Sequence, residues 1–230
     1  VVFPGQGSQK IGMAKEFFDK FEIVKKLFKD ANEALSFDIT KLVLEGPKEN
    51  LDLTANTQPA IFLVSYSIFN VIKNETKFKI NDAKFFAGHS LGEYSALTCS
   101  NAINFKDTIK LLKIRGKAMQ TAIPKNEGGM VAVLGENIDK IQDILNNKNK
   151  FNCYLANDNS NGQVVISGKI KDIDEFILEL KKLNIKNIKL PVSAPFHCIL
   201  MKPATDIMRN EILNTKFSKP SNLIISNVNA

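Results

Sequence analysis

The sequence is poor in the features that place a protein in a membrane or in an oxidising compartment. Cysteine is rare and odd in number, because only Cys99, Cys153 and Cys198 occur in 230 residues. Three widely spaced cysteines are typical of free thiols in a reducing compartment and argue against a disulfide framework. No apolar run approaches the roughly 18 residues that a membrane-spanning helix requires, so we expect no association with a membrane.

Histidine is scarcer still, since the chain holds only His89 and His197. Neither belongs to a cluster of cysteines and histidines with metal-ligand spacing, so the sequence predicts no metal site. A secretory signal peptide is not recognisable either, and we expect a protein that is not secreted. The sequence begins at Val1 rather than at methionine, which leaves open that a leader precedes it.

Positive charge is in excess, because 31 lysines and arginines face 24 acidic residues, which gives a net charge of +7. The basic residues are scattered and do not alternate with aromatic ones, so nucleic acid is not expected as a partner. Two interpretations of the lysines stay open. They are solvated faces of surface helices, or some of them form an electrostatic surface for an anionic partner.

The pattern that organises the chain is Gly88-His89-Ser90-Leu91-Gly92. An apolar run before it predicts the end of a buried strand, and the residues after it predict the start of a helix. A serine with a glycine two residues to either side, between a strand and a helix, is typical of the nucleophile elbow. The alternative is a strand-to-helix loop with an incidental serine, because so short a motif also arises by chance.

A serine nucleophile needs a base, because its hydroxyl is weakly nucleophilic at neutral pH. His89 is adjacent to Ser90 and is expected to point away from it, which leaves His197 as the candidate base. No acid is clearly placed to complete a triad, so the simpler expectation is a Ser–His dyad whose histidine tautomer is fixed by a backbone carbonyl. The oxyanion hole would take one N–H from Leu91 and a second from the turn Gly5-Gln6-Gly7.

The order of the expected elements indicates an α/β fold in two parts. Residues 125–190 are predicted to alternate as β-α-β-β-α-β, the order of a small ferredoxin-like α+β subdomain. This subdomain is inserted into a large α/β-hydrolase-like domain, residues 1–124 and 191–230, whose mostly parallel sheet carries the nucleophile elbow. In the large domain, a helix over residues 54–73 is expected to bury one apolar face.

Six stretches stand out along the chain. They are Phe3-Pro4-Gly5-Gln6-Gly7-Ser8-Gln9, Thr57-Gln58-Pro59-Ala60, Gly88-His89-Ser90-Leu91-Gly92-Glu93-Tyr94-Ser95-Ala96-Leu97, Arg115-Gly116-Lys117-Ala118-Met119-Gln120, Asn159-Ser160-Asn161-Gly162-Gln163-Val164-Val165 and Phe196-His197-Cys198. In their order and spacing, over nearly the whole chain, they resemble the malonyl-CoA:acyl carrier protein transacylase family. Six ordered motifs are far more specific than the elbow alone.

The resemblance implies a role for each site residue. Ser90 is the nucleophile that accepts the acyl group, and His197 is its general base. Backbone N–H groups of Gln6 and Leu91 form the oxyanion hole. Arg115 binds the malonyl carboxylate, which suits a guanidinium because it can hold a carboxylate through two parallel hydrogen bonds. Without the resemblance, Arg115 would count as one more cation on a basic helix.

Two further implications concern the surroundings of His197. Phe196, directly before it, is expected to line the acyl pocket and to leave little room for a 2-methyl branch. The family also has a glutamine beyond its last strand, whose backbone carbonyl orients the histidine. The sequence stops at Ala230, before that segment, so we expect the large domain to be truncated at its carboxyl end.

As a whole, the resemblance implies an acyl-carrier-protein S-malonyltransferase of fatty acid biosynthesis. It would transfer malonyl from malonyl-CoA to the phosphopantetheine thiol of acyl carrier protein through a malonyl-serine intermediate, with no cofactor beyond the CoA of the substrate. A monomer in the bacterial cytoplasm or in a plastid-type organelle (apicoplast, plastid or mitochondrial matrix) is expected. Two alternatives stay open: a serine thioesterase or acyl hydrolase on the same elbow, and an inactive carrier-binding fragment.

Overall fold

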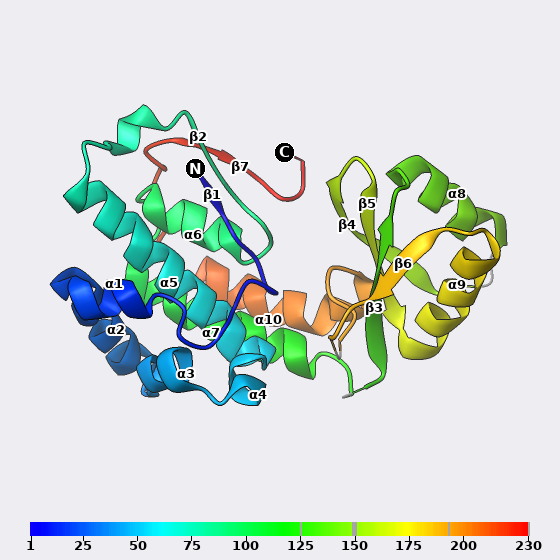
Figure 1. Ribbon diagram of the computed structural model, residues 1–230, viewed down its shortest axis with the longest axis horizontal. Coiled ribbons are helices and arrows are strands. Elements are labelled where there is room, and N and C mark those ends of the chain that lie inside the picture. The colour runs from blue at the N-terminus through cyan, green and yellow to red at the C-terminus, as the bar shows by residue number, and fades with distance from the viewer. Residues whose placement is uncertain (125, 149–150, 193, 230) are drawn as a thin grey trace. The chain divides into compact units, whose positions relative to one another are not determined.

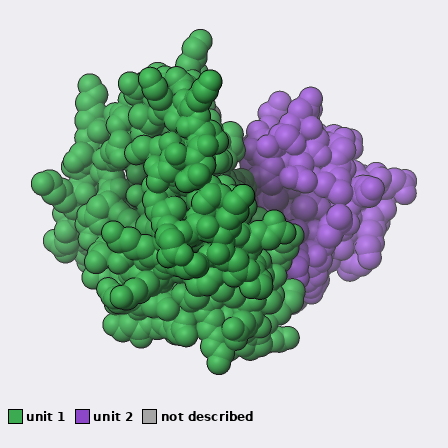
Figure 2. Space-filling model, turned by 60° about the vertical axis from the view of Figure 1, so that its left-hand side comes forward, with its two compact units in different colours: residues 1–117, 208–230 green, residues 118–207 purple. Residues whose placement is uncertain are grey.

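The computed structural model of the chain describes residues 1–124, 126–148, 151–192 and 194–229 (Figure 1). The chain divides into two compact units, of which unit 1 comprises residues 1–117 and 208–230, and unit 2 comprises residues 118–207 (Figure 2). Residue 125, where the inserted subdomain is predicted to begin, and Ala230 lie outside the described residues. The domain limits expected from the sequence differ from the limits of these units, and they stay a prediction.

Unit 1 contains a parallel sheet with the strand order β1-β2-β7. The strands are β1 (Val2–Phe3), β2 (Phe85–Gly88) and β7 (Leu223–Ile225). β2 is the middle strand, because Ala87 pairs with Val2 on one side and with Ile225 on the other. The residues that follow β2 therefore leave the sheet between two neighbouring strands.

Helices α5 (Thr54–Glu75) and α6 (Gly92–Cys99) pack against this sheet (Figure 1). Phe3 of β1 and Phe86 of β2 share one apolar cluster with Phe69 of α5 and Ala96 of α6. The remaining helices with residues in unit 1 are α1 (Lys15–Lys20), α2 (Glu22–Leu35), α3 (Ile39–Glu45), α4 (Lys48–Leu51), the 3-10 helix η1 (Ile80–Asp82), α7 (Phe105–Thr121) and α10 (Lys202–Leu213). The unit limits fall inside α7 and α10.

The first half of α5 forms the centre of the apolar core of unit 1. Every residue from Thr57 to Val64 is buried, and Phe62 and Leu63 are fully buried. The expected apolar face of α5 is buried at Ile61, Val64 and Val71, and in the first half burial extends beyond that face. α2, α3, α4 and α6 all pack against the helix. A helix with neighbours on several sides tolerates few exposed positions, whatever its own periodicity.

Unit 2 contains an antiparallel sheet with the strand order β4-β5-β3-β6. Its elements follow one another as β3 (Gly128–Leu134), α8 (Ile138–Lys148), β4 (Cys153–Ser160), β5 (Gln163–Lys169), α9 (Ile170–Lys182) and β6 (Lys186–Lys189). This is the β-α-β-β-α-β order expected from the sequence. The pairing of β4 with β5 is irregular, because it shifts register between Leu155 and Asn157 and again between Asp158 and Ser160.

Both faces of this sheet are covered within unit 2. Val131 and Val133 of β3 pack in one cluster with Phe176 of α9, while Met130 of the same strand packs in another with Phe196. Successive residues of a strand point to opposite faces of the sheet, which separates the two clusters. Phe196 precedes the 3-10 helix η2 (Ile199–Met201), and its packing fixes this loop within unit 2.

The sequence predicts no association with a membrane, no disulfide framework and no metal site. No helix in the described ranges combines the length and apolarity needed to cross a bilayer. Cys99, Cys153 and Cys198 are all free, as the sequence predicts. Within the same ranges, no group of three or more histidine, cysteine, aspartate or glutamate side chains is placed to hold a metal ion.

Candidate active site

Ser90 lies in the short turn between β2 and α6. Its φ is +53°, in the left-handed region that residues other than glycine rarely occupy. The turn is closed by hydrogen bonds from Gly92 N to His89 O (2.9 Å) and from Glu93 N to Ser90 O (3.1 Å). Backbone strain of this kind persists only where the surrounding structure imposes it, and it is typical of a nucleophile elbow. The strand, turn and helix expected around Ser90 are thus present.

The two glycines of the motif are required by space rather than by their own torsion angles. A Cβ atom on Gly88 would lie 2.5 Å from Glu93 N, and one on Gly92 would lie 2.6 Å from Phe3 O. Both distances are far below van der Waals contact, so a side chain at either position would force the backbone apart. The glycines therefore let the start of α6 pack directly on the ends of β1 and β2.

The glycine-rich turn after β1 lies against the elbow. A Cβ atom on Gly5 would be only 2.7 Å from His89 O, so the two backbone segments touch. The next residue, Gln6, donates through Nε2 to Thr54 Oγ1 at the start of α5 (3.2 Å). Gln6 and Leu91, from which the oxyanion hole is predicted, therefore belong to two adjoining turns of unit 1. The Leu91 side chain is buried in the core beneath the elbow.

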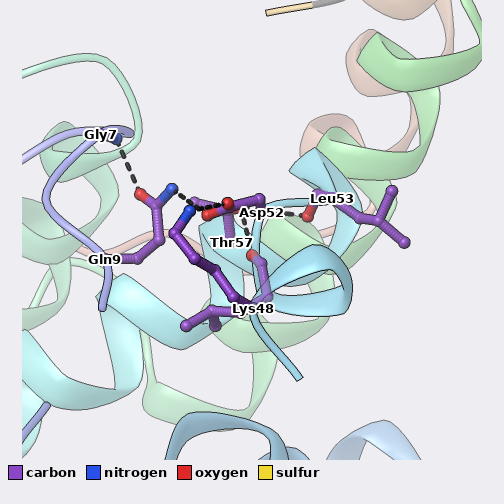
Figure 3. Close-up of polar contacts among 7 residues, drawn as sticks. Gly7, Gln9, Lys48, Asp52, Leu53 and Thr57 are labelled. Carbon is purple, nitrogen blue, oxygen red and sulfur yellow. Dashed lines mark hydrogen bonds and ion pairs between the residues drawn. The ribbon is translucent and has the colours of Figure 1, made fainter. Parts of the chain in front are cut away.

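A polar network anchors this glycine-rich turn to α4 (Figure 3). Gly7 N donates to Gln9 Oε1 (2.8 Å), and Gln9 Nε2 donates to Asp52 Oδ1 (2.9 Å). Lys48 of α4 forms an ion pair with the same carboxylate. The hydrogen bonds from Gln9 and Lys48 lower the pKa of Asp52, so the carboxylate stays ionised at neutral pH. The network thus holds the backbone that carries Gln6.

Arg115 of α7 reaches the elbow from the side of α5. Its Nη1 donates to Gln58 Oε1 (2.7 Å), and its Nη2 donates to Ser90 Oγ (3.3 Å). Close packing of the two helices makes this reach possible, because a Cβ atom on Gly116 would lie only 2.7 Å from Ala55 Cα. The structure therefore brings Ser90 and Arg115 together, as two of the predicted site residues.

The guanidinium of Arg115 is held among neutral partners. Its Cζ lies 5.8 Å from the centroid of the Tyr94 ring, a cation–π contact. Burial lowers the pKa of Arg115, while the nearby Tyr94 and Glu93 raise it, and an arginine stays protonated at neutral pH under such shifts. In the described part of the chain, no carboxylate forms an ion pair with Arg115. The site thus presents a cation beside Ser90 Oγ.

His197 lies in unit 2, whereas Ser90 lies in unit 1, so its action on Ser90 stays a prediction. Within unit 2, His197 is exposed and has a φ of +59°. It follows Phe196, which is 7% exposed and packs in the apolar cluster described above, and the Cys198 thiol donates to Pro195 O (3.1 Å). The loop that carries His197 is therefore fixed by the packing of Phe196 on one side, while His197 itself is exposed.

Three residues of this site escaped the sequence analysis. Gln58 occurs in one of the family motifs, but only the structure shows its contact with Arg115, and the contact of Tyr94 with the same guanidinium is equally non-local. Asn227, after β7, accepts a hydrogen bond from Ser90 N through Oδ1 (2.9 Å) and donates through Nδ2 to Gly88 O (2.8 Å). No pattern in the sequence connects this asparagine to the elbow.

Comparison with known proteins finds an acyltransferase family model and sequence relatives that match nearly the whole chain. The family model described as "Acyl transferase domain" matches residues 1–230. The chain is 40% identical over 230 residues to the malonyl CoA-acyl carrier protein transacylase of Haemophilus influenzae, which covers 99% of this chain and 73% of the relative.

Solved structures of malonyltransferases also match this chain over nearly its whole length. The acyl-carrier-protein-S-malonyltransferase of Bartonella henselae matches with a TM-score of 0.94 and 40% identity, over 99% of this chain and 73% of that chain. A malonyl-transacylase in complex with its type II PKS acyl-carrier protein matches with a TM-score of 0.92 and 37% identity, over 99% of this chain and 73% of that chain.

Proposed function

The chain belongs to the malonyl CoA-acyl carrier protein transacylase family, and we propose that it transfers malonyl groups from malonyl-CoA to acyl carrier protein. The acceptor is the phosphopantetheine thiol of the carrier, and the product supplies fatty acid elongation. The observation that carries the proposal is the hydrogen bond from Arg115 Nη2 to Ser90 Oγ. It puts a cation suited to a carboxylate beside a serine in a strained turn. A hydrolase of neutral acyl chains has no use for such a cation.

In the first half of the reaction, Ser90 Oγ attacks the thioester carbon of malonyl-CoA while His197 takes the hydroxyl proton. The carbonyl oxygen becomes an oxyanion and accepts hydrogen bonds from the N–H groups of Gln6 and Leu91. Collapse of this intermediate expels the CoA sulfur, which receives the proton from His197. A malonyl ester on Ser90 remains.

In the second half, the phosphopantetheine thiol loses its proton to His197 and attacks the ester carbon. The same N–H groups stabilise the second oxyanion, and Ser90 Oγ leaves with the proton from His197. Transfer is productive only if the thiol reaches the ester before an activated water does, so the site must discourage water from attacking. No cofactor is required, because the CoA enters and leaves as part of the substrate.

Arg115 gives the reaction its preference for malonyl. The free carboxylate of the malonyl group lies one methylene from the thioester carbonyl, so a guanidinium next to Ser90 Oγ is within its reach. Two parallel charge-assisted hydrogen bonds would hold this carboxylate, and Gln58 Oε1 keeps Nη1 in a fixed orientation. Phe196 would line the acyl pocket and limit the room for a 2-methyl branch.

We further propose that unit 2 is a ferredoxin-like subdomain and that unit 1 is an α/β-hydrolase-like domain. Unit 2 has the element order and the antiparallel strand order of a ferredoxin-like subdomain. The elbow of unit 1, on the middle strand of a parallel sheet, supports an α/β-hydrolase-like arrangement. We assign the protein to the bacterial cytoplasm or to the interior of a plastid-type organelle, acting as a monomer.

Intact-protein mass spectrometry tests the proposal. The protein is mixed with malonyl-CoA, then with acyl carrier protein that carries its phosphopantetheine arm. We expect a malonyl adduct that persists until the carrier is added and then appears on the carrier. Release of free malonate at the same rate without carrier would support a thioesterase instead. No adduct at all, with normal binding of carrier, would support a non-catalytic carrier-binding fragment.

A further inference from the structure

We propose that Asn227 is a positioning residue for the nucleophile, whose side-chain amide extends the parallel sheet by one residue and holds Ser90 in its strained conformation. The inference rests on the proposed function, because it takes Ser90 to be the nucleophile. It starts from the two hydrogen bonds of the amide, to Ser90 N (2.9 Å) and to Gly88 O (2.8 Å).

These two bonds have the pattern of a parallel β-ladder. In such a ladder, one residue donates its N–H to the carbonyl before the opposite residue and accepts from the N–H after it. β7 pairs with β2 as far as Ala87 and Ile225. Beyond that point the backbones part, and the Asn227 amide makes both bonds opposite His89. On the other side, His89 N donates to Phe3 O of β1 (3.0 Å). The elbow is therefore held from both neighbouring strands.

Glu93 of α6 fixes which way the Asn227 amide points. Its Oε2 accepts from Asn227 N (2.9 Å) and also from Asn227 Nδ2. If the amide were rotated by half a turn, its oxygen would face two acceptors, the Glu93 carboxylate and Gly88 O. Only the observed orientation satisfies both groups. A carboxylate in the first turn of α6 is also favourable at the positive end of the helix dipole.

The two hydrogen bonds of the Asn227 amide form a clamp on the elbow, and this clamp acts at Ser90, where the backbone is strained. A non-glycine residue with positive φ reverts to a relaxed conformation unless its surroundings over-determine it. Here the N–H of Ser90 itself is tied by Asn227, while Gly92 and Glu93 close the turn from the other side. Loss of the clamp should let Ser90 Oγ and the adjoining Leu91 N–H leave their alignment. Arg115 would still bind the substrate carboxylate, so binding and chemistry should respond differently.

The experiment compares Asn227→Ala and Asn227→Asp with Asn229→Ala as the matched control. Asn229 lies on the same segment, and among the described residues its side chain accepts from Ser226 Oγ (3.0 Å) rather than from the elbow. Two quantities are measured in each protein: hydrogen exchange of the Ser90 amide by NMR, and kcat and KM for malonyl transfer. Circular dichroism confirms that each variant is folded.

We expect both Asn227 variants to exchange the Ser90 amide at least tenfold faster and to lose at least tenfold in kcat, with KM changed by less than threefold. Asn227→Asp keeps the shape and the acceptor but loses the donor and meets the Glu93 carboxylate, so it should be as impaired as Asn227→Ala. Adding Glu93→Gln to Asn227→Asp should restore part of kcat, because it removes the repulsion. Asn229→Ala should behave as the parent protein.

Two results would overturn the inference. One is a folded Asn227→Ala variant with unchanged exchange at Ser90 and a kcat within twofold of the parent. The other is full activity of Asn227→Asp, which would show that the donor bonds of the amide to Gly88 O and to Glu93 are not needed to hold Ser90. If the parent protein forms no malonyl-Ser90 at all, the proposed function fails, while the exchange of the Ser90 amide still decides whether the clamp exists.

Discussion

Replacing Arg115 by alanine should lower kcat/KM for malonyl-CoA by roughly two orders of magnitude. The guanidinium contacts Gln58 Oε1 at 2.7 Å and Ser90 Oγ at 3.3 Å, both neutral, so its charge is available to a substrate carboxylate. A hydrogen bond to a charged group contributes roughly 1.5–3 kcal/mol. Two such bonds, partly replaced by water in the variant, leave a loss of about 3 kcal/mol, which is roughly 150-fold in rate.

The assay compares malonyl-CoA with acetyl-CoA. Acetyl-CoA has no carboxylate to lose, so Arg115→Ala should leave its kcat/KM unchanged or raise it, and the preference for malonyl should collapse. Arg115→Lys should recover only part of the malonyl rate, because an ammonium keeps the charge but cannot donate two parallel hydrogen bonds. Lys113→Ala serves as the control, since Lys113 lies on the same helix but donates to Asn56 (2.7 Å).

Equal losses for malonyl-CoA and acetyl-CoA in Arg115→Ala would refute this reasoning, because they would indicate damage to the elbow rather than loss of a carboxylate partner. A loss of kcat/KM for malonyl-CoA in Lys113→Ala would likewise indicate structural damage rather than loss of a carboxylate partner. Thermal unfolding of each variant separates these outcomes from a general loss of stability.

Three further predictions concern the supports of the site and the free thiols. Gly88→Ala should destabilise the protein by about 3 kcal/mol or more, seen as a lower urea midpoint, because its Cβ would meet the backbone of α6. Asp52→Asn should remove a stabilising contribution that is present above about pH 4 and lost as pH falls, since hydrogen bonds from Gln9 and Lys48 lower the pKa of this carboxyl in the folded protein. Cys153 should be alkylated slowly at neutral pH, as peptide mass spectrometry would show, because burial raises the pKa of its thiol to about 12.

Each of these predictions has a result that would contradict it. Gly129→Ala is the control for Gly88→Ala, because the close contact of its Cβ would be with the flexible end of the Ile170 side chain (2.8 Å), and its next contacts lie at ordinary van der Waals distance. Equal destabilisation by both would argue against a special constraint at the elbow. Identical acid unfolding of the parent and Asp52→Asn would remove the carboxylate from the anchoring network. Alkylation of Cys153 as fast as that of a small-molecule thiol would contradict the prediction that burial raises the pKa of this thiol.

The strand, turn and helix around Ser90 could be predicted from the sequence, because a buried strand, two spaced glycines and a helix start are local signals. The left-handed φ of Ser90 follows from the same motif. The order of elements in unit 2 was also readable, since each element there has its own periodicity. These features depend on residues close together in the chain.

Other features depend on contacts between distant residues and left no local signal. α5 carries an amphipathic pattern, yet its first half is buried all round because α2, α3, α4 and α6 surround it. The clamp by Asn227 joins residues 137 positions apart in the chain. The sequence likewise suggested that His197 is the base, and with Ser90 in the other unit that pairing stays a prediction.

The role of Ser90 as nucleophile is tested most directly by locating the malonyl group after a brief reaction with malonyl-CoA, by tandem mass spectrometry of the digested protein. We expect the group on Ser90 in the parent, none on any peptide of Ser90→Ala, and slow loading of Ser90 in a folded His197→Ala variant. Malonyl found on another residue, or undiminished loading in Ser90→Ala, would contradict the central claim that this elbow carries the nucleophile.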